Sequence, residues 1–266
     1  MEEQVEAFRE ESDALQALLA AEPSLDFSAP TQFKDWSAED ILRHLHCFNL
    51  AAARSLDGDE AFAGFIARFM EQERDRGQRG AEAASAGDLC GRALLDRWIE
   101  TAHAMADAFA DVDAKRRLKW VGPDMSARSS VTARFMETWS HAQALYDALG
   151  VERLNTDRIR NVVVLGVNTF GWTFANRKEE VPSAMPELRL TAPSGDVWQW
   201  GEASDDEHIS GSAEAFCQVV TQVRNVADTD LEVVGPIANR WMKQAQCFAG
   251  PPSDPPAPGV RFRRSV

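Results

Sequence analysis

The first 150 residues carry helical periodicity that short breaker segments interrupt, and no stretch among them alternates as a strand does. Pro23 and Pro30 break the first helical stretch, and Ser37 then offers a side chain that caps the start of the second. Gly150 stands where a helix of this kind ends. Four main helices without strands predict a four-helix bundle over residues 1–152. The four main helices are expected over 1–21, 37–55, 89–112 and 126–149, and a further helical stretch is expected over 60–84, with its second half exposed to solvent.

The rest of the chain alternates between short strands and short helices, which predicts a smaller α+β domain over residues 153–250. Residues 188–191 and 197–200 alternate on either side of a Pro-Ser-Gly turn and form the expected hairpin. The fold class is therefore α plus α+β, followed by a proline-rich tail at 251–266 that we expect to be extended or mobile. The other predicted elements are helices at 157–176, 212–224 and 236–248 and strands at 208–211 and 231–234.

Charge and composition exclude several classes of protein. The 266 residues have a formal net charge of -14, and residues 1–150 alone carry 16 basic and 27 acidic side chains, so we expect no nucleic-acid partner. The longest near-continuous apolar run, Val162 to Val167, is far shorter than a membrane span, and the acidic amino terminus does not resemble a signal peptide. The four cysteines form no CxxC pair. These features predict a protein of the cytoplasm with reduced thiols and no membrane partner.

Three side chains on two predicted helices form a candidate metal site. Glu137 and His141 are four residues apart, so on a helix their side chains can reach one point. His44 lies on the inward face of the second predicted helix, whereas His46, rotated about 200° from it, should point outward or sideways. Two neutral imidazoles and one carboxylate suit a divalent ion and leave a coordination position open. The alternatives are a surface Glu–His pair and a hydrogen-bonded core histidine.

The same residues carry a family resemblance. Residues 36–45, Trp-Ser-Ala-Glu-Asp-Ile-Leu-Arg-His-Leu, resemble the W-(S/T)-x-x-(D/E)-(I/V/L)-(I/L)-x-H-L segment of the DinB-like, mycothiol-dependent maleylpyruvate isomerase family. Glu137-x-x-x-His141 resembles the ExxxH motif on the last bundle helix of that family. Stretches 168–174, 190–195 and 241–250 resemble members that join a DinB-like bundle to a sterol-carrier-protein-like α+β domain. The resemblance implies a divalent metal, commonly zinc, at His44, Glu137 and His141, although these ligand types also suit nickel, manganese or iron.

The resemblance also implies an activity. Such enzymes bind a low-molecular-weight thiol such as mycothiol or glutathione, whose pKa a dication lowers so that a thiolate exists at neutral pH. That thiolate adds to a small electrophilic acid, which gives S-transfer, or it adds to an unsaturated acid and leaves after bond rotation, which gives cis–trans isomerisation. Arg224 is the expected clamp for a carboxylate of the thiol or the substrate. The main alternative is a non-catalytic, metal-dependent protein that binds a small molecule, and a purely structural protein is another. We expect the chain to act as a monomer or a homodimer.

Overall fold

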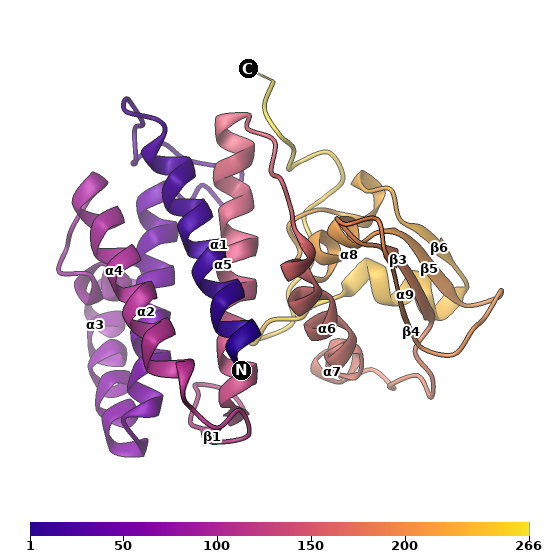
Figure 1. The fold of residues 1–266 in the computed structure, drawn as a ribbon, viewed down its shortest axis with the longest axis horizontal. Coiled ribbons are helices and arrows are strands. Elements are labelled where there is room, and N and C mark those ends of the chain that lie inside the picture. The colour runs from indigo at the N-terminus through magenta and orange to yellow at the C-terminus, as the bar shows by residue number, and fades with distance from the viewer. Residues whose placement is uncertain (266) are drawn as a thin grey trace. The chain divides into compact units, whose positions relative to one another are not determined.

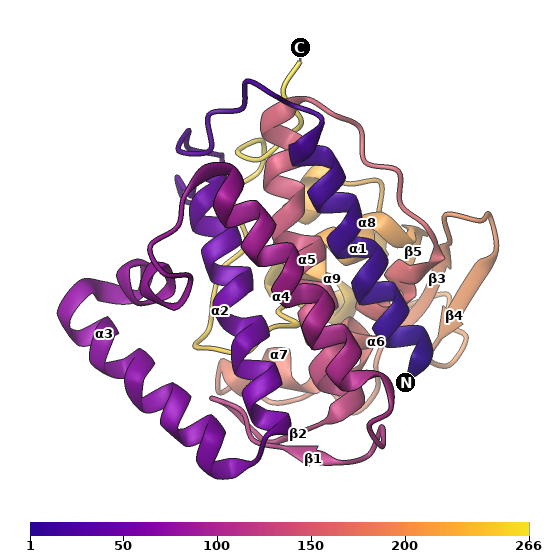
Figure 2. The same ribbon diagram turned by 60° about the vertical axis from the view of Figure 1, so that its left-hand side comes forward.

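A computed structural model, which describes residues 1–265, divides the chain into two compact units, Met1–Ala148 and a second that begins at Leu149. The long helices of the first unit run alongside one another (Figures 1 and 2). The organisation predicted from the sequence, a helical bundle followed by an α+β unit, is confirmed. The helices of the bundle are α1 (Glu2–Ala20), α2 (Ala38–Leu56), α3 (Asp59–Ser85), α4 (Gly91–Ala110) and α5 (Ala127–Leu149).

Helix α2 packs against both α3 and α4, while α1 packs against α4. Its start is fixed by a capping box. The Ser37 hydroxyl accepts the backbone N–H of Asp40, and the Asp40 carboxylate accepts the backbone N–H of Ser37. The sequence prediction that Ser37 caps this helix is therefore confirmed.

Two features of the bundle differ from the sequence prediction. A short hairpin of β1 (Arg117–Leu118) and β2 (Met125–Ser126) joins α4 to α5. Two residues per strand are too few to produce a visible alternation. Helix α3 is broken at Gly77, whose φ of 71° and ψ of 171° lie outside the helical region, and the short segment after the break turns back toward α2 (Figure 2).

The second unit contains a four-stranded sheet in the order β4-β3-β5-β6. The predicted hairpin is confirmed as the antiparallel pair β3–β4, whereas β3 and β5 are parallel and β5 and β6 antiparallel. Helix α8 packs against β3 and β5. The strands are β3 (Glu187–Thr191), β4 (Val197–Trp200), β5 (His208–Ser212) and β6 (Glu232–Val234), and the helices are η1 (Asp157–Ile159), α6 (Arg160–Asn168), α7 (Phe170–Asn176), α8 (Ala213–Val220), η2 (Val226–Asp228) and α9 (Pro236–Gln244).

Three predicted helices of this unit have different bounds in the structure. The helix expected over 236–248 ends at Gln244. The helix expected over 157–176 is divided into η1, α6 and α7. The helix expected over 212–224 ends at Val220, because Gln222 adopts a left-handed conformation with a φ of 57°. The backbone N–H groups of Val223 and Arg224 then return to the carbonyl of Gln218 and close the helix end.

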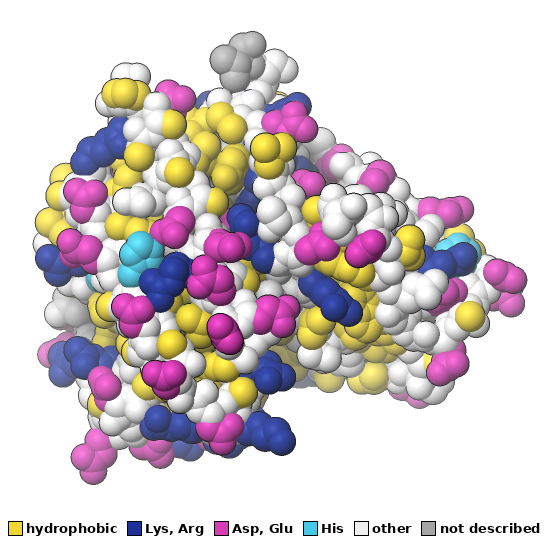
Figure 3. Space-filling view, viewed as in Figure 1, with side chains coloured by type: hydrophobic (Ala, Val, Ile, Leu, Met, Phe, Trp, Pro, Cys, Tyr) yellow, Lys and Arg dark blue, Asp and Glu magenta, His cyan; other side chains and the backbone are white. Residues whose placement is uncertain are grey.

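Residues 251–265 form no helix or strand, yet side chains of the second unit hold their backbone. The Gln246 side chain donates to the carbonyl of Pro251 and accepts the N–H of Ser253, and the Asn225 amide donates to the carbonyl of Pro256. Over the face in Figure 3, acidic and basic side chains are interspersed. Among the described residues, no helix combines the length and the apolar character that crossing a membrane requires.

Candidate metal centre

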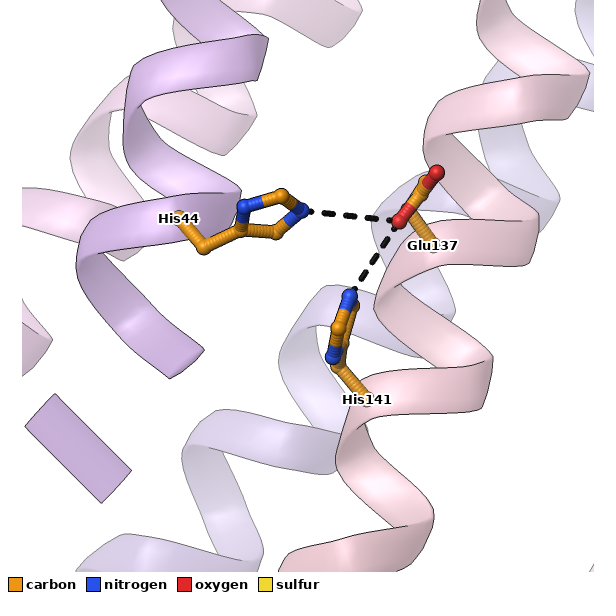
Figure 4. Close-up of side chains that lie close together, drawn as sticks. All are labelled: His44, Glu137 and His141. Atoms are coloured by element: carbon orange, nitrogen blue, oxygen red, sulfur yellow. Dashed lines mark ion pairs between the residues drawn. The ribbon is translucent and has the colours of Figure 1, made fainter. Parts of the chain in front are cut away.

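His44, on α2, and Glu137 and His141, on α5, converge on one point of the bundle (Figure 4). The Nε2 atom of His141 lies 3.2 Å from Oε2 of Glu137, and Nε2 of His44 lies 3.6 Å from the same oxygen. One ligand atom from each residue can be chosen so that all three lie within 4.8 Å of one another. All three side chains are less than 20% exposed. The structure therefore brings together the three side chains that the sequence singled out.

Aromatic rings enclose the two histidines. The Trp36 indole is nearly parallel to the His141 ring, with an interplanar angle of 3° and centroids 5.6 Å apart, and it also meets the edge of His44 at 5.3 Å. Phe33 contacts His141 edge to face at 5.0 Å, and Phe48 lies 4.8 Å from His44. Trp36 immediately precedes the Ser37 cap, so the capping box that starts α2 also fixes the position from which this indole reaches the two histidines. The rings give the polar cluster an apolar surround in which electrostatic interactions are strong.

Two charged residues that the sequence analysis did not select also touch the cluster. Glu82 lies in the part of α3 that was expected to face solvent, yet its side chain is 1% exposed and its Oε1 lies 2.9 Å from Nδ1 of His44. No pattern in the sequence around Glu82 predicts this contact, because the contact depends on the break of α3 at Gly77. Arg134 is 5% exposed, lies 3.8 Å from Glu137 and covers the rings of Phe48 and Trp120. Its i,i+3 spacing from Glu137 on one helix was a usable signal.

Burial and neighbouring charges set the protonation of the cluster. Burial alone lowers the pKa of His44, but the hydrogen bonds and charges of Glu137 and Glu82 outweigh it and raise that pKa to about 9. Burial opposes ionisation of Glu137, yet the hydrogen bonds of His141 and His44 and the charge of Arg134 hold its pKa well below the usual range. Burial and the neighbouring charge of His44 lower the pKa of His141 despite Glu137. A cation would therefore displace a proton from His44 and meet an ionised Glu137 and a neutral His141.

Comparison with known proteins identifies the bundle. Residues 8–146 match the sequence profile of the "Mycothiol maleylpyruvate isomerase N-terminal domain", which covers more than half of the chain. The chain belongs to this family. The family resemblance stated from residues 36–45 and 137–141 is thereby confirmed.

Relatives and solved structures agree with this assignment. Uncharacterized protein Rv0036c of Mycobacterium tuberculosis (strain ATCC 25618 / H37Rv) is 36% identical over 244 residues, which span 92% of this chain and 94% of that protein. Uncharacterized protein MT0041 of strain CDC 1551 / Oshkosh matches over the same lengths at the same identity. The crystal structure of the mycothiol-dependent maleylpyruvate isomerase superposes with a TM-score of 0.54 at 15% identity, over 82% of this chain and 87% of that one. The crystal structure of a mutant of that enzyme superposes with a TM-score of 0.55, also at 15% identity, over 88% of this chain and 95% of that one. At this identity the superposition shows a shared fold.

The donor set of this member of the mycothiol maleylpyruvate isomerase N-terminal domain family fits a divalent cation. Ligand atoms about 2.1 Å from a tetrahedral ion lie about 3.4 Å from one another. The two distances to Oε2 of Glu137, 3.2 and 3.6 Å, lie on either side of that value. His44, Glu137 and His141 would hold the ion, and three protein ligands leave one tetrahedral position for another molecule.

Two neighbours of His44 on α2, His46 and Cys47, are buried in the bundle. His46 was expected to point outward or sideways, but it is 3% exposed, and that prediction is wrong. The reason is that α3 and α4 cover α2 from two sides, so more than one face of this helix is buried. Cys47 is fully buried, and burial raises the pKa of its thiol to about 12, which agrees with a core cysteine rather than a ligand.

Arg224, the predicted carboxylate clamp, belongs to the second unit. It lies four residues beyond the end of α8, and its side chain is 8% exposed. Its Nη1 lies 3.4 Å from the carbonyl of Val223 and donates to it. A buried guanidinium is the group that recognises a carboxylate through two parallel hydrogen bonds.

Proposed function

We propose that the protein is a divalent-metal-dependent enzyme that uses a low-molecular-weight thiol, with mycothiol the leading candidate, to isomerise a small unsaturated acid or to transfer the thiol to an electrophilic one. Its cation, with zinc the leading candidate and nickel, manganese or iron as alternatives, would be held by His44, Glu137 and His141. The single observation that carries the proposal is the convergence of these three donors, in a chain of this family, at distances that suit one ion.

A bound dication would lower the pKa of a thiol at its open position and so supply a nucleophile at neutral pH. The protein contributes the setting for this chemistry. Glu137 brings the negative charge that offsets part of the ion's charge, and the hydrogen bonds of His141 and His44 together with the charge of Arg134 hold the pKa of this buried carboxylate well below its usual range. The rings of Trp36, Phe33 and Phe48 limit the access of water to the two imidazoles.

The second unit would bind the carboxylates of the reactants through Arg224 in this proposal. A planar guanidinium matches a carboxylate in two parallel hydrogen bonds, and both the thiol and the acid offer such groups. An enzyme that uses a reduced thiol needs a reducing compartment, so we propose that the protein acts in the cytoplasm.

Metal content tests the proposal first. Purified wild type, His141→Ala and the matched control His103→Ala are compared by elemental analysis after identical loading. His103 is a partly exposed histidine of α4 that pairs with Asp13 outside the cluster. We expect about one ion per chain in the wild type and in His103→Ala, and a clear loss in His141→Ala. Equal occupancy of all three proteins would overturn the proposal.

Turnover then separates an enzyme from a binding protein. The metal-loaded protein is mixed with mycothiol or glutathione together with a panel of cis-unsaturated acids and electrophiles, and loss of the acid is followed by absorbance. The proposal expects thiol-dependent conversion that the His141→Ala variant lacks. Tight binding of thiol or acid without any conversion would instead support a non-catalytic, metal-dependent binding protein.

A further inference from the structure

Glu82 is the most completely buried carboxylate next to the candidate metal ligands, with a side chain that is 1% exposed. Glutamate is almost never buried to this extent unless it is paired. Its Oε1 meets Nδ1 of His44 at 2.9 Å and also accepts the side-chain amide of Gln78 at 3.0 Å. Glu82 therefore connects the short segment after Gly77 directly to one of the three converging side chains.

The imidazole of His44 presents its two nitrogens to two different carboxylates. Nδ1 faces Glu82, and Nε2 faces Glu137 at 3.6 Å. These nitrogens flank Cε1 and point in different directions, and Glu82 is not among the three residues whose donor atoms converge on one point. A carboxylate has only acceptor atoms, so the hydrogen of this contact belongs to Nδ1, and the lone pair of a neutral ring then lies at Nε2.

We infer that Glu82 is a positioning residue of the metal centre, which holds the His44 ring in the orientation and tautomer that direct Nε2 at the ion. This inference rests on the proposed function and deepens it. Histidine ligands of metals commonly donate their other ring N–H to a carboxylate, which fixes the ring and raises its basicity. Glu82 touches neither the ion nor the reactants and acts only through His44.

The segment that carries Glu82 is held next to α2 by the break at Gly77 and by contacts of Arg79. The break at Gly77 redirects α3, so residues 78–85 form a separate short segment. Arg79 joins that segment to α2 through its 3.5 Å ion pair with Asp40, and its guanidinium lies over the Trp36 ring. The segment is thus tied to the first turn of α2, which places Glu82 across from His44 on the next turn.

The test compares metal affinity in three variants of the whole 266-residue chain. Glu82→Gln keeps the size and one acceptor oxygen, Glu82→Ala removes the contact, and Glu71→Gln is the matched control at an exposed position of the same helix. Zn²⁺ affinity is measured by competition with a chromogenic chelator, and the ligand-field spectrum of bound Co²⁺ reports the geometry. Loss of an outer carboxylate of this kind lowers metal affinity about 10- to 100-fold. We expect that loss for Glu82→Ala with a shifted Co²⁺ spectrum, a smaller loss for Glu82→Gln and none for Glu71→Gln.

The outcomes separate this inference from the proposed function. If the wild type binds Zn²⁺ and both Glu82 variants bind it equally well, the positioning role is overturned and the metal centre stands. A lower thermal stability of the metal-free Glu82 variants with unchanged affinity and spectrum would also overturn it, because Glu82 would then be a structural residue alone. If the wild type binds no ion, both fail together. Should Glu82→Ala not fold, Glu82→Gln decides the matter by the same two readouts.

Discussion

The two units of the chain use their buried polar side chains in different ways. In the bundle, His44, Glu82, Glu137 and His141 contact one another, and their charges sit in one apolar enclosure. In the second unit, Gln222 and Gln246 contact the backbone instead: both donate to carbonyls of irregular segments.

This difference separates chemistry from architecture. A charged group buried without good partners costs several kcal/mol, so a buried cluster of ionisable groups is expensive to keep. A buried amide that completes the hydrogen bonds of a loop stabilises the fold directly. Substitutions in the first set should therefore change ligand binding, whereas substitutions in the second set should change stability. Four experiments test this contrast between the two units.

The largest effect is expected from cysteine labelling, which checks that both units have closed cores. Burial raises the pKa of Cys47 in the bundle to about 12 and that of Cys217 in the second unit well above its usual range. A thiol with a pKa near 12 holds roughly 1,000-fold less thiolate than an ordinary one. Iodoacetamide should therefore label only the exposed Cys90 quickly in the native protein, by peptide mass analysis, and all four cysteines after unfolding. Fast native labelling of Cys47 would show that the bundle core opens.

Glu137→Gln should give the next largest effect. Zinc binding by a structural site is worth roughly 10–16 kcal/mol over four ligands, so one ligand contributes about 3 kcal/mol, or at least about 100-fold in affinity. Chelator competition with Zn²⁺ measures the loss, and Glu100→Gln, at an exposed position of α4, should bind like the wild type. An unchanged Zn²⁺ affinity in Glu137→Gln would show that the buried cluster of the bundle does not serve metal binding.

Gln246→Ala should lower the stability of the second unit by about 2 kcal/mol. Gln246 is 2% exposed, and its amide donates to two carbonyls and accepts one backbone N–H, which the substitution leaves without these partners. Urea unfolding measures the change in the free energy of unfolding, and Gln199→Ala, at an exposed position of β4, is the control. Zn²⁺ affinity should stay at the wild-type level. A loss of metal binding without a loss of stability would reverse the roles assigned to the two units.

Arg224→Lys should have the smallest effect, and it is the one exception that we propose to the architectural role of the second unit. Lysine keeps the charge but loses the two-pronged contact, so KM for the thiol or the acid should rise about 10-fold while metal content stays constant. Arg263→Lys, a half-exposed arginine paired with Glu152, is the control. An unchanged KM would leave Arg224 as a buried structural residue.

The sequence was informative wherever function or fold depends on local spacing. The i,i+4 spacing of Glu137 and His141 and the position of His44 on the inward face of its helix predicted three side chains that the structure brings together, because a regular helix fixes their directions. The Ser37 cap and the hairpin of the second unit were predictable for the same reason, since each is determined within a few residues.

The rest depends on tertiary structure. Glu82 reaches His44 only because the chain leaves the helical region at Gly77, and a glycine within a helical pattern does not reveal whether the helix continues. His46 is buried because two other helices cover α2, and no periodicity within α2 contains that information. The early end of α8 follows from a left-handed Gln222, a residue with no strong preference for that conformation.

The parallel contact between Trp36 and His141 has a practical consequence. An indole 5.6 Å from an imidazole shares its immediate environment, so its fluorescence should respond when that imidazole acquires a new partner. A paramagnetic ion such as Co²⁺ or Cu²⁺ would quench this emission at short range, against the background of the other seven tryptophans of the chain, and a Trp36→Phe variant identifies the part of the signal that belongs to Trp36. The indole of Trp36 can thus serve as an optical sensor beside His141, and the occupancy of the metal site can be titrated without attaching a dye.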